Sequence, residues 1–171
     1  MSNDQSIPWH KNDALFRQLQ GMGRAFEGIV AAHLIASGIG VRVEPMRTRP
    51  SVESRKSYRD IRDIVAICPA GFEADIEVKS RAVECTSAED FPHASIFVDA
   101  KEIVDEKGPP TAVVCVSQVT GAMLVIPESS RPHWFEKTSI DRVRKIKRTW
   151  YVCPNEYLKT FDELLIFLNA R

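Results

Sequence analysis

The sequence has no long hydrophobic run and no surplus of charge of either sign. No apolar stretch approaches the ~20 residues that a membrane span needs, and the opening segment MSNDQSIPWHKND lacks the apolar core of a secretion signal. We therefore expect a cytoplasmic location and no membrane partner. The formal net charge is zero, so a polyanionic partner must be held by local basic clusters or by a metal ion.

Paired cysteines are also missing. Cys68, Cys85, Cys115 and Cys153 are widely scattered, with no C-x-x-C pair and no histidine at ligand spacing. This argues against a zinc site and against a disulfide framework. We expect four free, mostly buried thiols.

The length and composition favour one domain. A chain of 171 residues that is 44% hydrophobic and 27% charged can build one hydrophobic core and is short for two. We expect a single domain over residues 1–171, with its core at about 12–127 and a C-terminal basic segment and helix at 138–171. The sequence contains no internal repeat and no low-complexity segment.

The spacing of apolar residues predicts an α/β fold. Helical periodicity predicts a first helix over 12–37, and Gly21 and Gly23 leave open whether it is one helix or two. A basic stretch at 141–154 precedes an amphipathic helix at 156–171, and residues 47–62 form a polar, basic loop. Together these elements predict a mixed sheet with helices before and after it. The predicted strands are 41–46, 63–68, 73–81, 94–100, 111–118 and 122–127.

The segment DIEVKSR, residues 75–81, carries charge at every second position of a predicted strand. Successive side chains of a strand point to opposite faces, so Asp75, Glu77 and Lys79 share one face. Asp63 opens the preceding strand, and the short turn between the two strands brings its carboxylate towards this charged row. Asp63, Glu77 and Lys79 are therefore expected to meet at one end of the sheet.

This group of side chains suits metal-assisted chemistry on phosphate esters. Two carboxylates and a backbone carbonyl, such as that of Val78, form an oxygen-rich site for a hard cation like Mg²⁺. The Lys79 ammonium can orient or deprotonate an attacking water, or stabilise charge on the phosphate. The pattern predicts metal-assisted phosphodiester hydrolysis.

At these residues the sequence resembles the PD-(D/E)xK nuclease superfamily, the fold of many restriction enzymes, Holliday-junction resolvases and phage exonucleases. The family motif is an aspartate at the head of one strand and E-x-K or D-x-K on the next, matched by Asp63 and by EVK at 77–79. Many members add a glutamate on the first helix in a pattern like G-x-x-F/A-E, and GRAFEGIVAAHLIASG supplies Glu27 there. The resemblance covers residues 20 to about 100.

The resemblance departs from the family pattern at the aspartate. No proline precedes it, and the segment YRDIRD offers both Asp60 and Asp63. We prefer Asp63 because an apolar run, 64–67, begins directly after it, and Asp60 stays open as the alternative.

The resemblance implies a restriction-endonuclease-like mixed central sheet flanked by helices, in a small phage-type member of the superfamily. It implies a catalytic set of Lys79, Glu77, Asp63 and Glu27, with Mg²⁺ held by Asp63, Glu77, Glu27 and the Val78 backbone, and Mn²⁺ as a substitute. The implied activity is hydrolysis of DNA in phage or bacterial repair, recombination or restriction. Since many proteins of this fold dimerise, a homodimer is an open possibility by analogy.

Structural explanations compete with each of these roles. E-x-K on a strand is often a solvated cross-strand ion pair, and Asp75 can be an outward residue at the start of its strand. Glu27 can pair with Arg24. The whole protein can therefore also be a non-catalytic nucleic-acid-binding or assembly protein that retains the nuclease fold.

Two basic clusters are candidates for contact with DNA, including branched or single-stranded DNA. Such residues can neutralise phosphates, and neighbouring rings can stack on bases, although charge runs are usually solvated faces. Arg81, directly after the E-x-K segment, is a further candidate. The first cluster lies in the loop before Asp63 and comprises Arg47, Arg49, Arg55, Lys56, Arg59 and Arg62. The second precedes Trp150 and Tyr151 and comprises Arg142, Arg144, Lys145, Lys147 and Arg148.

Overall fold

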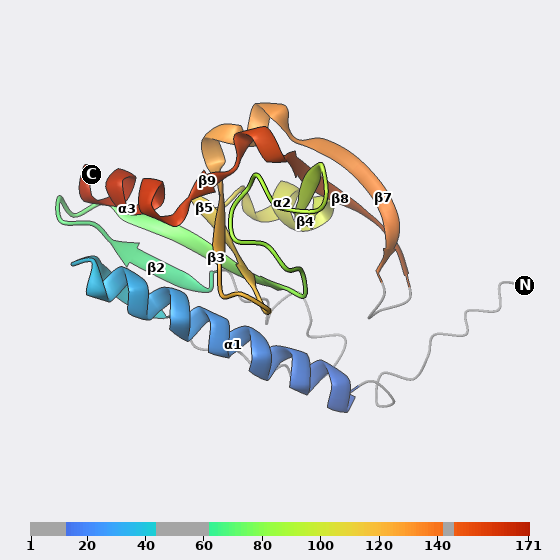
Figure 1. Ribbon diagram of the computed structural model, residues 1–171, viewed down its shortest axis with the longest axis horizontal. Helices are drawn as coiled ribbons and strands as arrows, with labels where there is room; N and C mark the ends of the chain where they lie inside the picture. The colour runs from blue at the N-terminus through green and yellow to red at the C-terminus, as the bar shows by residue number, and fades with distance from the viewer. Residues whose placement is uncertain (1–12, 44–61, 142–145) are drawn as a thin grey trace, which may run out of the picture.

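The computed structural model describes residues 13–43, 62–141 and 146–171, apart from the side chains of 13–20. Figure 1 shows how the elements are arranged. In chain order they are α1 (Asp13–Ala36), β1 (Gly40–Val43), β2 (Ile64–Ile67), β3 (Glu73–Arg81), β4 (Ser95–Ala100), α2 (Lys101–Lys107), β5 (Ala112–Ser117), β6 (Met123–Pro127), the 3-10 helix η3 (Glu128–His133), β7 (Phe135–Asp141), β8 (Ile146–Pro154), the 3-10 helix η4 (Asn155–Tyr157), β9 (Lys159–Thr160) and α3 (Phe161–Asn169).

A six-stranded mixed sheet with the order β1-β2-β3-β5-β6-β9 forms the centre of the fold. Strands β3 and β5 are parallel, and the other neighbouring strands are antiparallel. All six residues of β5, AVVCVS, are buried, as expected for a central strand that is covered on both faces. The prediction of an α/β protein with a mixed sheet flanked by helices is confirmed.

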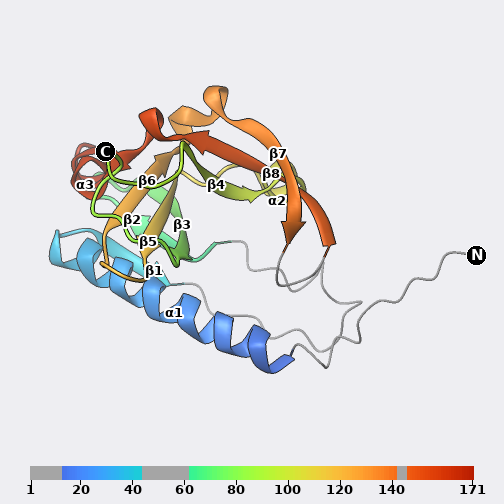
Figure 2. The same ribbon diagram turned by 45° about the vertical axis from the view of Figure 1, so that its right-hand side comes forward.

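Helices α1 and α3 cover one face of this sheet, and Figure 2 shows α1 running beneath it. Val30 and Leu34 of α1 pack in the same hydrophobic cluster as Leu168 of α3 and Ile76 of β3. Helix α1 is continuous through Gly21 and Gly23, which resolves the choice between one helix and two. It ends where Gly38 adopts a φ of 82° and the Ile39 N–H donates to the Leu34 carbonyl, a conformation that glycine adopts without steric cost.

A second sheet of three strands, β4-β8-β7, covers the opposite face together with α2. Ile96 and Val98 of β4 pack against Val113 and Cys115 of β5. Residues 94–100, expected in the mixed sheet, therefore belong to another layer. The physical reason is that β3 pairs directly with β5 over 76–81, so no place is left between them for β4, which pairs with β8 instead.

The C-terminal third also differs from the prediction. Much of the basic stretch at 141–154 forms β8, the central strand of the second sheet, and the unassigned residues 135–141 form its partner β7. The expected helix at 156–171 is shorter, since η4 and β9 precede α3.

The four cysteines are free and buried, as predicted. In residues 13–43, 62–141 and 146–171, no helix is long and apolar enough to cross a membrane.

A capping box fixes where α3 begins. The Thr160 side chain accepts from the Glu163 backbone N–H, and the Glu163 side chain accepts from the Thr160 backbone N–H. We expect Thr160→Ala to lower the free energy of unfolding by about 1 kcal/mol in urea denaturation, because one N-terminal N–H of the helix loses its acceptor. Thr160→Ser keeps the hydroxyl and is expected to retain most of the stability. Equal losses in both variants would assign the effect to packing of the threonine methyl group.

Candidate functional site

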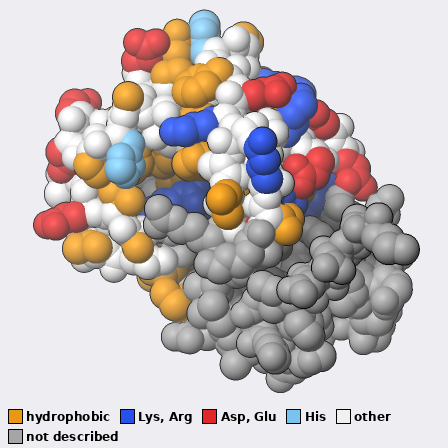
Figure 3. Space-filling view, turned by 90° about the vertical axis from the view of Figure 1, so that its right-hand side faces the viewer, with side chains coloured by type: hydrophobic (Ala, Val, Ile, Leu, Met, Phe, Trp, Pro, Cys, Tyr) orange, Lys and Arg blue, Asp and Glu red, His pale blue; other side chains and the backbone are white. Residues whose placement is uncertain are grey.

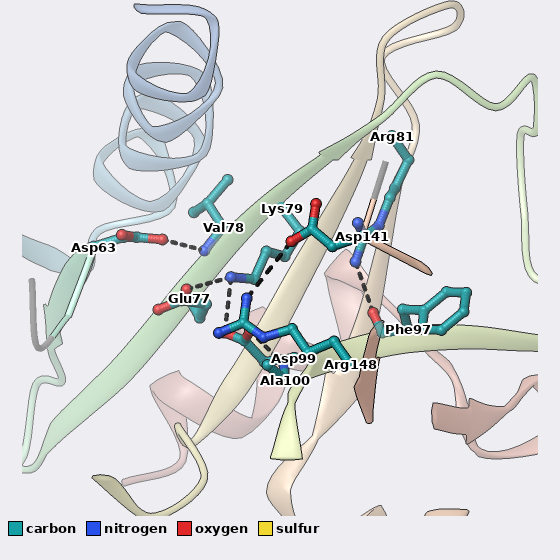
Figure 4. A network of polar contacts seen from close by, with 10 residues as sticks. All are labelled: Asp63, Glu77, Val78, Lys79, Arg81, Phe97, Asp99, Ala100, Asp141 and Arg148. Atoms are coloured by element: carbon teal, nitrogen blue, oxygen red, sulfur yellow. Dashed lines mark hydrogen bonds and ion pairs between the residues drawn. The ribbon is translucent and has the colours of Figure 1, made fainter. Parts of the chain in front are cut away.

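The register of β2 and β3 brings Asp63 next to Glu77. Ile64 pairs with Ile76 in this antiparallel ladder, so Asp63, one residue before, lies opposite Glu77, one residue after. The Asp63 carboxylate also accepts a hydrogen bond from the Val78 backbone N–H, with 2.8 Å between nitrogen and Oδ2. The sequence-predicted aspartate is thus tied to the middle of the E-x-K segment (Figure 4).

Lys79 lies on the same face of β3 as Glu77 and is held by two carboxylates. Its Nζ is 2.6 Å from Oε1 of Glu77 and 3.0 Å from Oδ2 of Asp99. The side chains of Lys79, Glu77 and Asp99 are 25%, 22% and 17% exposed. The three groups therefore form a partly buried network that solvent can still reach.

Asp99 is the residue of this network that the sequence interpretation missed. It lies on β4, where Ile96, Val98 and Ala100 are buried in alternation. A signal was available, since an acid inside the apolar strand SIFVDA needs a partner when it is partly buried. Nothing local identifies that partner, because only the packing of the second sheet over β3 brings Asp99 to Lys79.

Two neighbouring carboxylates act on Asp63. The pKa of Asp63 is raised to about 7, chiefly by burial and further by the charges of Glu77 and Glu27. The Val78 N–H and the Lys79 ammonium partly offset it. Glu27 is buried on α1, and its Oε2 is 2.5 Å from Nη1 of Arg24. Asp63, Glu77 and Glu27, which are far apart in the sequence, therefore lie near one end of the sheet.

The charges of Lys79 and Asp99 stabilise each other. Burial alone lowers the pKa of Lys79, but Glu77 and Asp99 more than compensate, so its pKa lies above the ordinary lysine value. Burial alone raises the pKa of Asp99, and the Lys79 ammonium reverses this, so the net pKa is lowered. Both groups are therefore charged at neutral pH.

Carboxylate oxygens from two adjacent strands are donors of the type that a hard cation prefers. Asp63 and Glu77 offer carboxylate oxygens from adjacent strands. Burial is the main cause of the raised pKa of Asp63 and the charge of Glu77 is the second, and a divalent cation would favour the charged form of this carboxylate. The described residues contain no group of three His, Cys, Asp or Glu side chains at metal-binding spacing. The oxygen donors that the sequence predicts for Mg²⁺ are therefore two adjacent carboxylates, and Glu27 is near enough to act on Asp63 electrostatically.

Asp75 continues the charged row but has a structural partner. Its Oδ1 is 3.1 Å from Nε of Arg62, so this arginine, a DNA-contact candidate, is engaged in an ion pair beside the site. Both residues, with Glu77, Asp99 and Lys107, line a pocket of about 90 Å³. The pocket carries charges of both signs next to the Lys79 network.

The other candidates for nucleic-acid contact fall into three groups. Arg81 donates through Nη2 to the Phe97 carbonyl at 2.7 Å, which joins β3 to β4. Arg148, expected on a basic surface, is instead buried and pairs with Glu102 and Asp141, whereas Lys147 is exposed. The remaining candidates lie outside the described residues, as does Asp60: Arg47, Arg49, Arg55, Lys56, Arg59, Arg142, Arg144 and Lys145.

The end of the molecule that carries the hairpin β7–β8 has a mixed surface. Figure 3 views this side and shows Lys and Arg side chains among hydrophobic ones, with Asp and Glu side chains nearby. The described part of this face is therefore not uniformly basic. Nucleic acid would have to be held here by individual contacts and not by a broad positive field.

Comparison with known proteins gives no family assignment. No protein-family model matches the chain, and no curated protein matches its sequence.

Proposed function

We propose that this protein is a metal-dependent nuclease with a restriction-endonuclease-like fold, which hydrolyses phosphodiester bonds of DNA in phage or bacterial repair, recombination or restriction. One observation carries the proposal. Asp63 and Glu77 lie opposite each other on adjacent strands, and the Lys79 ammonium is 2.6 Å from Glu77. Two acids and a lysine in this arrangement are groups that metal-assisted phosphodiester hydrolysis can use.

Each residue has a distinct role in the proposed reaction. Asp63, Glu77 and the Val78 carbonyl would hold Mg²⁺ or Mn²⁺, and Glu27 contributes negative charge from α1. The cation, when bound, would stabilise the charge that develops on the phosphate oxygens. An ammonium carries three N–H donors, and Lys79 directs two of its donors to Glu77 and Asp99. The third donor would orient the attacking water or contact a phosphate oxygen in the proposed reaction.

The decisive experiment is cleavage of a panel of linear, nicked, branched and single-stranded DNA. The purified protein is incubated with Mg²⁺, with Mn²⁺ or with EDTA, and products are resolved on denaturing gels. We expect cleavage with either metal and none with EDTA. Glu77→Gln is expected to abolish it, whereas the matched variant Glu84→Gln, at an exposed position three residues after Arg81, is expected to cleave normally. Absence of cleavage on every DNA form and on RNA would contradict the proposal.

A second candidate is a non-catalytic nucleic-acid-binding or assembly protein with the same fold. It is favoured by the ion pairs Lys79–Glu77 and Arg24–Glu27, which neutralise two of the three carboxylates without metal. This candidate predicts that DNA binding, measured by mobility shift, persists without any cleavage and is unchanged by Glu77→Ala. Metal-dependent cleavage would exclude it.

A further inference from the structure

The Lys79 ammonium is held from two separate sheets. Glu77 approaches it from the same strand, β3, and Asp99 approaches it from β4 of the three-stranded sheet. Figure 4 shows the two carboxylates on either side of the ammonium. The proposed reaction uses Glu77 as a metal ligand, so one partner of Lys79 has a second task.

Two hydrogen bonds fix the orientation of the Asp99 carboxylate. Its Oδ1 accepts from the Ala100 backbone N–H at 2.6 Å, while Oδ2 accepts from Lys79. The ladder between β4 and β8 shifts register between Phe97 and Ala100, the stretch that contains Asp99. Helix α2 begins at Lys101, directly after this point. The carboxylate is therefore fixed at the junction of a strand and a helix.

A metal ion on Glu77 would leave Asp99 as the carboxylate that holds the Lys79 ammonium. A divalent cation bound to Glu77 would neutralise much of the negative charge that attracts the Lys79 ammonium. The cation would also repel the ammonium directly. Without a second carboxylate, Lys79 would turn towards solvent, since its side chain is already a quarter exposed. We infer that Asp99 is a positioning residue, which keeps the Lys79 ammonium at the reacting phosphate while Glu77 serves the metal. This inference rests on the proposed nuclease function.

The first test measures how firmly Asp99 holds Lys79, and it needs neither metal nor cleavage. Glu77→Gln removes the competing carboxylate charge, and the labelling rate of Lys79 by an amine-reactive reagent is followed by mass spectrometry. We expect labelling in Glu77→Gln/Asp99→Asn to be about tenfold faster than in Glu77→Gln, as for a shift of one pKa unit. Lys101, held by Asp105 and Glu136, is the internal control and should label equally in both. Equal rates for Lys79 would overturn the inference.

The second test measures the consequence for cleavage. We expect Asp99→Asn to lower kcat by about 10- to 100-fold with KM changed less than twofold, as for outer partners of catalytic groups. Asp99→Glu should restore part of kcat, because it keeps the charge. Asp105→Asn, on the neighbouring helix, should leave kcat unchanged. A full kcat in Asp99→Asn would overturn the positioning role.

The two tests separate failure of this inference from failure of the proposed function. If the wild type does not cleave but the labelling rates differ as expected, the nuclease proposal fails and Asp99 remains the residue that holds Lys79. If the wild type cleaves and the labelling rates are equal, the nuclease proposal stands and the role of Asp99 is withdrawn. Loss of the native circular dichroism spectrum in Asp99→Asn would transfer the kinetic test to Asp99→Glu. There, a kcat between those of Lys79→Ala and the wild type, with KM changed less than twofold, supports retention by charge, and a kcat below that of Lys79→Ala contradicts it.

Discussion

Replacing Lys79 with alanine is expected to lower the rate of metal-dependent DNA cleavage by about 10²- to 10⁴-fold. The Lys79 ammonium directly contacts both Glu77 and Asp99. Replacing Lys79 removes the positive charge of this network, which in the proposed reaction acts on the phosphate. The effect should appear in single-turnover kinetics at saturating enzyme, where it reports the chemical step and not the release of product.

Lys101→Ala is the matched control for this experiment. Lys101 also pairs with two carboxylates, Asp105 and Glu136, but it lies on α2 outside the charged row of β3. Its replacement should leave the cleavage rate within about twofold of the wild type. If Lys79→Ala cleaves as fast as Lys101→Ala, the Lys79 network is structural and the proposed mechanism is wrong. Lys79→Arg separates charge from geometry, because a planar guanidinium keeps the positive charge but does not reproduce the geometry of an ammonium.

The parts of the fold that the sequence predicted depend on short-range patterns. Helix α1 follows from apolar residues at helical spacing, and β3 follows from strict alternation of charged and apolar residues. The meeting of Asp63 with Glu77 also follows from local information, because the turn between β2 and β3 is short enough to set the register. These elements place most of the candidate site without knowledge of the remaining chain.

The parts that could not be predicted depend on contacts between distant segments. The pairing of β4 with β8 joins residues 50 to 59 positions apart, and no pattern within residues 94–100 distinguishes this pairing from a place in the mixed sheet. Asp99 reaches Lys79 only as a consequence. Arg148 likewise resembles a solvated basic residue in the sequence, whereas its acidic partners come from α2 and β7.

The buried Arg148 leads to the largest expected effect on stability. Its side chain is 5% exposed, with Nη2 2.5 Å from Oε1 of Glu102 and Nη1 3.7 Å from Oδ2 of Asp141, which is 8% exposed. Arg148→Ala should lower the free energy of unfolding by about 3 kcal/mol, because Asp141 keeps its buried charge and loses this cation. The value is at the lower end for a buried pair, since Glu102 is half exposed. The melting temperature should fall by roughly 6–12 °C in a chain of this size.

Lys147→Ala provides the control, because Lys147 is the exposed neighbour of Arg148 on the same strand. This substitution should change the free energy of unfolding by less than about 0.5 kcal/mol. The double variant Arg148→Met/Asp141→Leu separates charge from packing. If the loss in Arg148→Ala arises because the buried Asp141 carboxylate loses this cation, the double variant should recover a large part of it, since apolar groups of similar volume often replace buried ion pairs without loss. A double variant as unstable as the sum of its single changes would instead show that Arg148 stabilises the second sheet through its packing near Trp150, whose ring lies 5.5 Å from the guanidinium carbon.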